Sequence, residues 1–141
     1  VEGQAASADL EKLAEGGSTD QFIASADAEP HVMDTASGTA PVGPGTMDMS
    51  ELMTEDDADS FISLATMLVN TNDAFLGVNS QNIKNLAVGE SKTLYANAMD
   101  AGTERISGAL SDIPGPAAGG EGFNATRDDQ DIIIHRQSQW C

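Results

Sequence analysis

The sequence is poor in basic residues, and this scarcity excludes one large class of partner. Lysine and arginine together number 6, against 23 aspartates and glutamates, and the formal net charge is −17. Nucleic-acid binding requires clustered basic side chains that displace counterions from phosphates. We therefore expect no nucleic-acid partner. The same charge disfavours direct adsorption to anionic lipid unless bound cations intervene.

Cysteine, aromatic residues and long apolar runs are also scarce. The single cysteine, Cys141, cannot form an intrachain disulfide, so cysteine usage does not report the cellular compartment. Aromatic residues make up only 4% of the chain, so a core must rest on Leu, Ile, Val, Met and Ala. No apolar run approaches the roughly 20 residues of a membrane helix, and we expect no transmembrane segment. The length of 141 residues favours one domain over residues 1–141.

The motifs of common enzyme classes are missing as well. The two histidines, His31 and His135, lie in no recognisable nucleophile motif, and no Gly-x-Ser-x-Gly sequence is present. There is no glycine-rich loop of the kind that cradles phosphates. A hydrolase needs a nucleophile beside a base and an orienting group. We therefore expect a protein without catalysis, with an unrecognised hydrolase as the less favoured alternative.

Hydrophobic periodicity predicts two short helices near the N-terminus. Residues 6–15 place Leu10 and Leu13 on one face and end at the pair Gly16-Gly17, which stops a helix. A second short helix is expected to start at residues 18–20. The favoured interpretation is that both helices plug the end of a sheet, and the alternative is a partner-binding helix pair.

Short apolar segments separated by turns predict a mainly antiparallel β fold. The strongest candidates are 61–68, 74–78 and 92–99, with weaker ones at 31–33, 46–52 and 132–134. The segment 61–68 is apolar on both faces, which is typical of a central strand. The pattern favours an all-β fold, a sandwich of two antiparallel sheets accompanied by the two short helices.

Carboxylates gather where two of the predicted strands meet loops. Asp73 directly precedes the segment 74–78, and Asp100 and Glu104 bracket a turn containing Gly102 just after 92–99. If both loops lie at one end of a sheet, the three carboxylates can surround a hard cation, for which calcium suits irregular oxygen ligands best. The alternative is that Asp100 caps a turn while the other two are solvated.

Two motifs carry a resemblance to a known family. The sequence Asn-Asp-Ala-Phe-Leu-Gly at 72–77 and Asp-Ala-Gly-Thr-Glu at 100–104, with Ile-Pro-Gly-Pro at 113–116, closely resembles the spondin domain family in its bacterial secreted form. The resemblance implies a β sandwich similar to C2 domains, in a secreted adhesion or surface-interaction module located outside the cell or in the periplasm. It also implies a calcium site with three carboxylate ligands, which by motif fall on Asp73, Asp100 and Glu104.

The chain departs from the family pattern in several places. Glu104 stands where the animal members have aspartate, which adds one methylene of reach, and Met99 replaces an aromatic residue. The comparison with the family pattern predicts that the chain lacks both terminal strands of the sandwich, which would leave a sheet edge open to pairing with another chain. The chain opens with Val1, which indicates either that an upstream segment such as a signal peptide was removed or that the sequence is a fragment. The expected partners are calcium and an unknown protein or surface glycan, and the alternative function is a metal-free secreted scaffold.

Overall fold

The computed structural model describes residues 1–54, 60–115 and 118–135, and the account below refers to these residues. Two helices come first: α1 spans Ala8–Gly16 and α2 spans Asp20–Asp27. The strands follow, listed in chain order with a short 3-10 helix η1 (Leu110–Asp112) before the last: β1 (Phe61–Met67), β2 (Ala74–Asn82), β3 (Asn97–Asp100) and β4 (Ile134–His135). The chain is therefore mostly β and irregular, with two short helices, as predicted.

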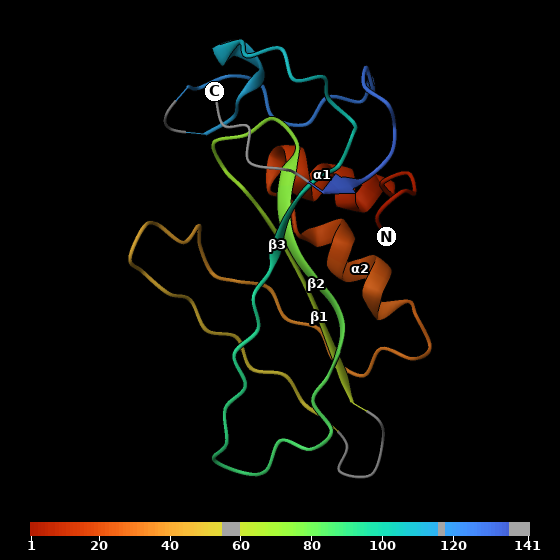
Figure 1. Cartoon of the computed structure of the whole chain (residues 1–141), viewed down its shortest axis with the longest axis vertical. Helices are drawn as coiled ribbons and strands as arrows, with labels where there is room; N and C mark the ends of the chain where they lie inside the picture. The colour runs from red at the N-terminus through yellow and green to blue at the C-terminus, as the bar shows by residue number, and fades with distance from the viewer. Residues whose placement is uncertain (55–59, 116–117, 136–141) are drawn as a thin grey trace.

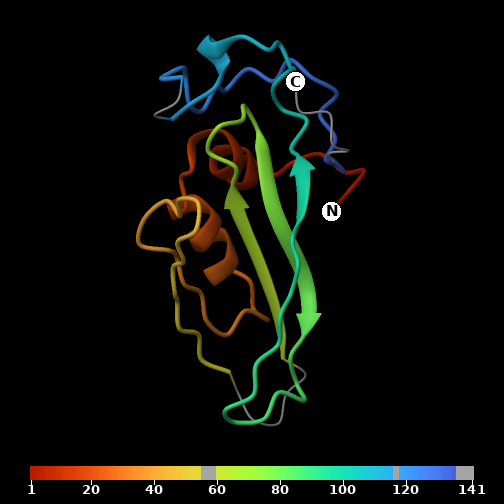
Figure 2. The same cartoon turned by 60° about the vertical axis from the view of Figure 1, so that its left-hand side comes forward.

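The strands form one antiparallel sheet in the order β1-β2-β3-β4. The pairing of Met67 with Phe75 places the end of β1 beside the beginning of β2, and Ala74 pairs with Asp100 at the end of β3. Three strand ends therefore meet at one end of the sheet (Figures 1 and 2). The prediction of a central strand at 61–68 is wrong, because β1 lies at the edge and both Phe61 and Leu64 are exposed.

The other strand predictions also need correction. The segments 31–33 and 46–52 form no strand, and Met47 is 92% exposed, since alternation without a partner strand or a core to cover creates no ladder. The predicted strand 92–99 is regular only over Asn97–Asp100. In contrast, β2 continues beyond the predicted 74–78 to Asn82, because β1 pairs with it along that length. The last strand is Ile134–His135 rather than 132–134.

The two helices lie on the same side of the sheet, with α1 against its upper end (Figures 1 and 2). Gly17 caps the C-terminal end of α1, and its φ of 67° is the left-handed conformation that glycine adopts at helix ends. The small core contains Ala14 of α1, Phe75 of β2 and Ile133 next to β4. A second sheet is not found within the described ranges, so the sandwich itself stays a prediction.

Arg127 attaches the segment before β4 to α1. Its Nε donates to Glu11 Oε1 at 2.9 Å and its Nη2 donates to Glu11 Oε2 at 2.7 Å and to the Ala6 carbonyl oxygen at 2.9 Å. It also pairs with Asp131. This bidentate contact with Glu11 is the stronger form of an arginine–carboxylate pair. It holds a segment more than 100 residues away in sequence against the helix.

Candidate cation site

The loop from 68 to 73 sets the position of Asp73 at the start of β2. Thr71 Oγ1 donates to the Leu68 carbonyl oxygen at 2.7 Å and accepts from the Ala74 N–H at 3.1 Å. The Leu68 N–H in turn donates to the Ala74 carbonyl oxygen at 2.9 Å. These contacts close the β1–β2 connection tightly. Asp73 is left fully buried, with 0% of its surface exposed.

The loop from 100 to 104 follows β3 and closes on itself. Asp100 Oδ1 accepts from the Gly102 N–H at 2.9 Å, a local turn of the kind that aspartate favours. Gly102 has a φ of +70°, and a Cβ there would lie 2.2 Å from the Ile132 carbonyl oxygen. Only glycine fits this position. Asp100 therefore does form a turn cap, as the alternative interpretation required, but Asp73 and Glu104, which that interpretation left solvated, are buried.

The two loops lie side by side and are joined through Asp73. Asp73 Oδ2 accepts from the Thr103 N–H at 3.0 Å and the Glu104 N–H at 3.1 Å. Asn72 Nδ2 donates to the Glu104 carbonyl oxygen at 3.0 Å. Glu104 is 6% exposed. The structure thus places all three predicted residues, buried, at one end of the sheet, while their role as ligands stays a prediction.

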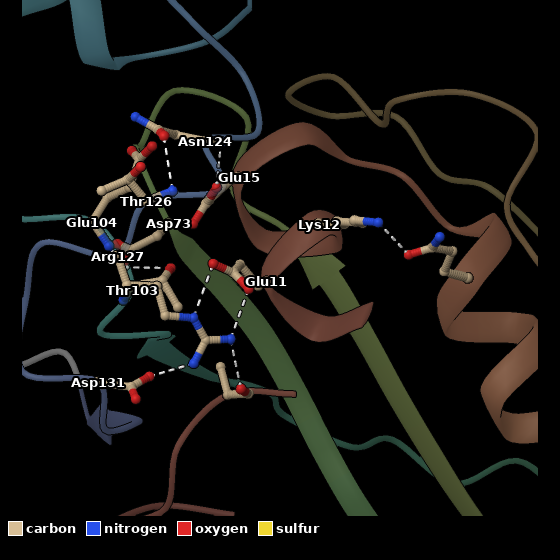
Figure 3. A network of polar contacts seen from close by, with 12 residues as sticks. Glu11, Lys12, Glu15, Asp73, Thr103, Glu104, Asn124, Thr126, Arg127 and Asp131 are labelled. Carbon is tan, nitrogen blue, oxygen red and sulfur yellow. Dashed lines mark hydrogen bonds and ion pairs between the residues drawn. The ribbon is translucent and has the colours of Figure 1, made fainter. Parts of the chain in front are cut away.

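A fourth buried carboxylate, which the sequence analysis missed, comes from α1. Glu15 is 0% exposed, and its Oε2 accepts from the Asn124 N–H at 2.9 Å. Figure 3 shows Glu15 beside Asp73 and Glu104, which come from the start of β2 and the loop after β3. Glu11 and Glu15 are four residues apart on α1 and are both buried, but the helix sequence alone does not indicate this burial.

Burial and mutual repulsion shift the proton affinity of these groups. Burial first, and then the charges of Glu15 and Asp73, raise the pKa of Glu104 to about 8. Burial also raises the pKa of Glu15 above its ordinary value. Within the described residues, Glu15 Oε1 and Glu104 Oε1 are buried without a hydrogen-bond partner. Such oxygens are costly unless a proton or a cation accompanies them.

The chemistry of the donors fits a hard cation. The buried side chains offer carboxylate oxygens and no nitrogen or sulfur, which matches calcium and magnesium rather than zinc. The described residues contain no group of three or more His, Cys, Asp or Glu already arranged to hold a metal ion. Binding would therefore require side-chain rotations. The two partnerless oxygens of Glu15 and Glu104 are the observation in favour of a fit.

A cavity of about 170 Å³ opens beside this cluster. Its lining is mainly polar and acidic and consists of Glu104, Arg105, Ser107, Asp112, Glu121, Asn124 and Asp128. Glu104 belongs to both the cluster and the cavity wall. The negative charges of Glu121 and Asp112 act on Glu104 from this side. The cavity therefore gives a cation an electrostatically favourable approach to the buried carboxylates.

An antiparallel sheet with a buried, oxygen-rich corner at one end defines a mostly β module. Residues 1–112 match the family described as Spondin_N, which covers well over half of the chain. The chain therefore belongs to the spondin domain family, and the resemblance seen in its motifs is confirmed. No curated protein and no solved structure was found to match it. None of the helices in the described ranges is long and apolar enough to cross a membrane.

Proposed function

We propose that this chain is a calcium-binding interaction module that acts outside the cell or in the periplasm, in adhesion or surface interaction, without catalysis. The observation that carries the proposal is the burial of Asp73, Asp100 and Glu104 where two loops meet at one end of the sheet. Family membership supports the extracellular, adhesive setting. The partner is a protein or a surface glycan.

Calcium suits this corner for two physical reasons. It accepts six to eight oxygens in irregular arrangements, as loops can supply, including neutral ones such as the Asn72 amide and backbone carbonyls. It also relieves repulsion, since two carboxylates about 4 Å apart at an effective dielectric near 20 repel each other by on the order of 4 kcal/mol. When bound, the ion would supply positive charge at the loops, and Asp73, Asp100 and Glu104 would hold it.

Thermal unfolding with and without calcium tests the proposal. Millimolar calcium should raise the melting temperature of the chelator-treated chain, because an ion that binds only the folded state stabilises it. Asp100→Asn keeps an oxygen for the Gly102 N–H but removes the charge, and it should abolish most of the rise. The control is Asp48→Asn, since Asp48 is exposed and likewise accepts backbone N–H groups, from Thr39 and Met49.

The alternative, a metal-free scaffold, rests on a specific observation. Asp73 Oδ2 already accepts two backbone N–H groups, and this alone would explain an aspartate that fixes two loops. The lack of a preformed three-ligand group in the described residues points the same way. Under this alternative, calcium leaves the melting temperature unchanged in both the wild type and Asp100→Asn.

A further inference from the structure

Glu15 is a charged group buried in a setting that does not account for it. It lies in the last turn of α1, next to the buried Leu13 and Ala14, and none of its surface is exposed. One oxygen accepts from the Asn124 N–H, and the other has no hydrogen-bond partner within the described residues. An ionised carboxylate is kept in such a place only if something compensates its charge.

Glu11, one helical turn earlier, is a buried glutamate whose negative charge is compensated. It is also buried, at 5% exposure, but both of its oxygens accept from the Arg127 guanidinium. The ion pairs of Arg127 seen in the described part of the chain are with Glu11 and Asp131. The helix therefore buries two glutamates four residues apart, one with a basic partner and one with none among these residues.

The negative charge of Glu11 acts on Glu15 more strongly than the positive charge of Arg127 does. Glu15 lies beside Asp73 and Glu104 (Figure 3). The charge of Glu15 contributes more than any other neighbouring charge to the raised pKa of Glu104. Glu104 Oε1 also lacks a hydrogen-bond partner in the described ranges. Two partnerless carboxylate oxygens, from α1 and from the loop after β3, thus belong to one cluster, and a cation could accept both.

We propose that Glu15 is a further ligand of the cation, so that α1 contributes to a site otherwise built from two loops of the sheet. This inference rests on the proposed function and deepens it. It adds a charged ligand that the motifs of the loops do not contain. It also gives the cation a structural effect, because an ion held by Glu15 attaches the last turn of α1 to the end of the sheet.

Calorimetric calcium titrations of three chelator-treated chains test the assignment: the wild type, Glu15→Gln and Glu29→Gln. Glutamine keeps the shape of Glu15 and its acceptor for the Asn124 N–H but removes the charge. The dissociation constant should rise on the order of tenfold or more in Glu15→Gln, since calcium affinity follows the charge of the ligand set. Glu29→Gln, an equal charge change at an exposed position, should leave it within about twofold of the wild type.

Hydrogen exchange of the wild type adds a readout that does not depend on the variant folding. If Glu15 binds the ion, calcium should slow exchange in α1 as well as in the loops 68–73 and 100–104. Protection confined to the loops, or a Glu15→Gln affinity equal to that of Glu29→Gln, overturns the assignment and leaves the calcium site intact. A wild type that shows neither binding heat nor protection overturns the proposed function itself, and this assignment with it.

Discussion

At the scale of single residues, Asp73 and Gly102 determine how the two loops meet. Asp73 receives the Thr103 and Glu104 N–H groups on one oxygen, so a single carboxylate fixes the path of the neighbouring loop. Gly102 lets that loop turn against the backbone at Ile132. The second motif of the family thus has a structural reason for its glycine that is independent of any ion.

Alanine at Gly102 should be strongly destabilising. The added Cβ would meet the Ile132 carbonyl oxygen at 2.2 Å, and the left-handed φ disfavours any side chain. We expect a loss of about 3 kcal/mol in the free energy of unfolding, measured by urea denaturation. Gly108→Ala is the matched control: its φ is +72° with no atom within 4 Å of the new Cβ, so it should cost about 1 kcal/mol. Equal losses for the two variants would refute this explanation.

The raised pKa of Glu104 predicts a stability that falls as pH rises. The folded group ionises near 8 and an ordinary glutamate at 4.5, so the folded chain binds the extra proton between these values. This contribution is complete below pH 4.5 and is lost as pH rises through 8. Glu104→Gln in chelator should remove a fall of on the order of 1–2 kcal/mol between pH 5 and 9, after allowance for solvent screening.

Urea denaturation at a series of pH values measures this effect. The informative quantity is the difference in slope between Glu104→Gln and the wild type, because the two chains share every other acidic group. Glu29→Gln, with its exposed side chain, should keep the wild-type slope. If Glu104→Gln also keeps it, Glu104 ionises normally in the folded chain and the buried cluster is wrongly described.

At the scale of elements, the helix α1 depends on a contact that is distant in sequence. Arg127 joins Glu11 and the Ala6 carbonyl oxygen to the segment before β4. This contact fixes one side of the corner in which Glu15 and Asn124 lie. The position of the fourth carboxylate therefore depends on the C-terminal segment as well as on the helix itself.

Removal of this contact should lower the free energy of unfolding by more than removal of a surface charge does. Arg127→Gln leaves Glu11 buried without its cation, and we expect a loss of about 2–3 kcal/mol in the free energy of unfolding. Lys12→Gln alters a basic residue on the same helix, whose ammonium donates to Gln21 and lies 5.3 Å from the centroid of the Phe123 ring. It should cost no more than about 1 kcal/mol. Urea denaturation is the appropriate measurement, because urea, unlike guanidinium chloride, does not screen ion pairs. Similar losses in both variants would show that Arg127 is not the attachment point.

The sequence predicted those elements whose signals are local. The Gly16-Gly17 stop defined the end of α1, and the motif around 72–77 marked the start of β2. The strand prediction failed at 46–52, where alternation had no partner strand. The strand predicted at 61–68 formed as β1, but at the edge of the sheet and not at its centre. Pairing partners are decided by tertiary contacts, which a local pattern does not contain.

In the candidate site, too, the sequence predicted the residues that lie in local motifs and missed the one that depends on tertiary contacts. Asp73, Asp100 and Glu104 could be proposed because each lies in a recognisable loop motif, and the structure places them buried at one end of the sheet. Glu15 could not, because a glutamate on a short helix is usually solvent-exposed. Its burial depends on residues 123–127 folding back over α1, which no local signal in the helix announces.

At the scale of the whole molecule, the net charge of −17 acts against the compact state. Added monovalent salt screens this repulsion, so the melting temperature in chelator should rise by a few degrees between 20 and 300 mM sodium chloride. Sucrose at matched osmolality is the control for solvent effects that are not ionic. A melting temperature that falls with salt would show that attractive ion pairs, and not overall repulsion, dominate the electrostatics of the fold.

The central claim is that oxygens from the two loops surround a divalent ion. The most direct test is a calorimetric titration of calcium into the purified, chelator-treated chain at pH 8.5, where Glu104 is mostly ionised. We predict saturable binding of about one ion per chain, lost in Asp73→Asn and retained in Asp48→Asn. A titration without binding heat, with a melting temperature that calcium leaves unchanged, would contradict the claim.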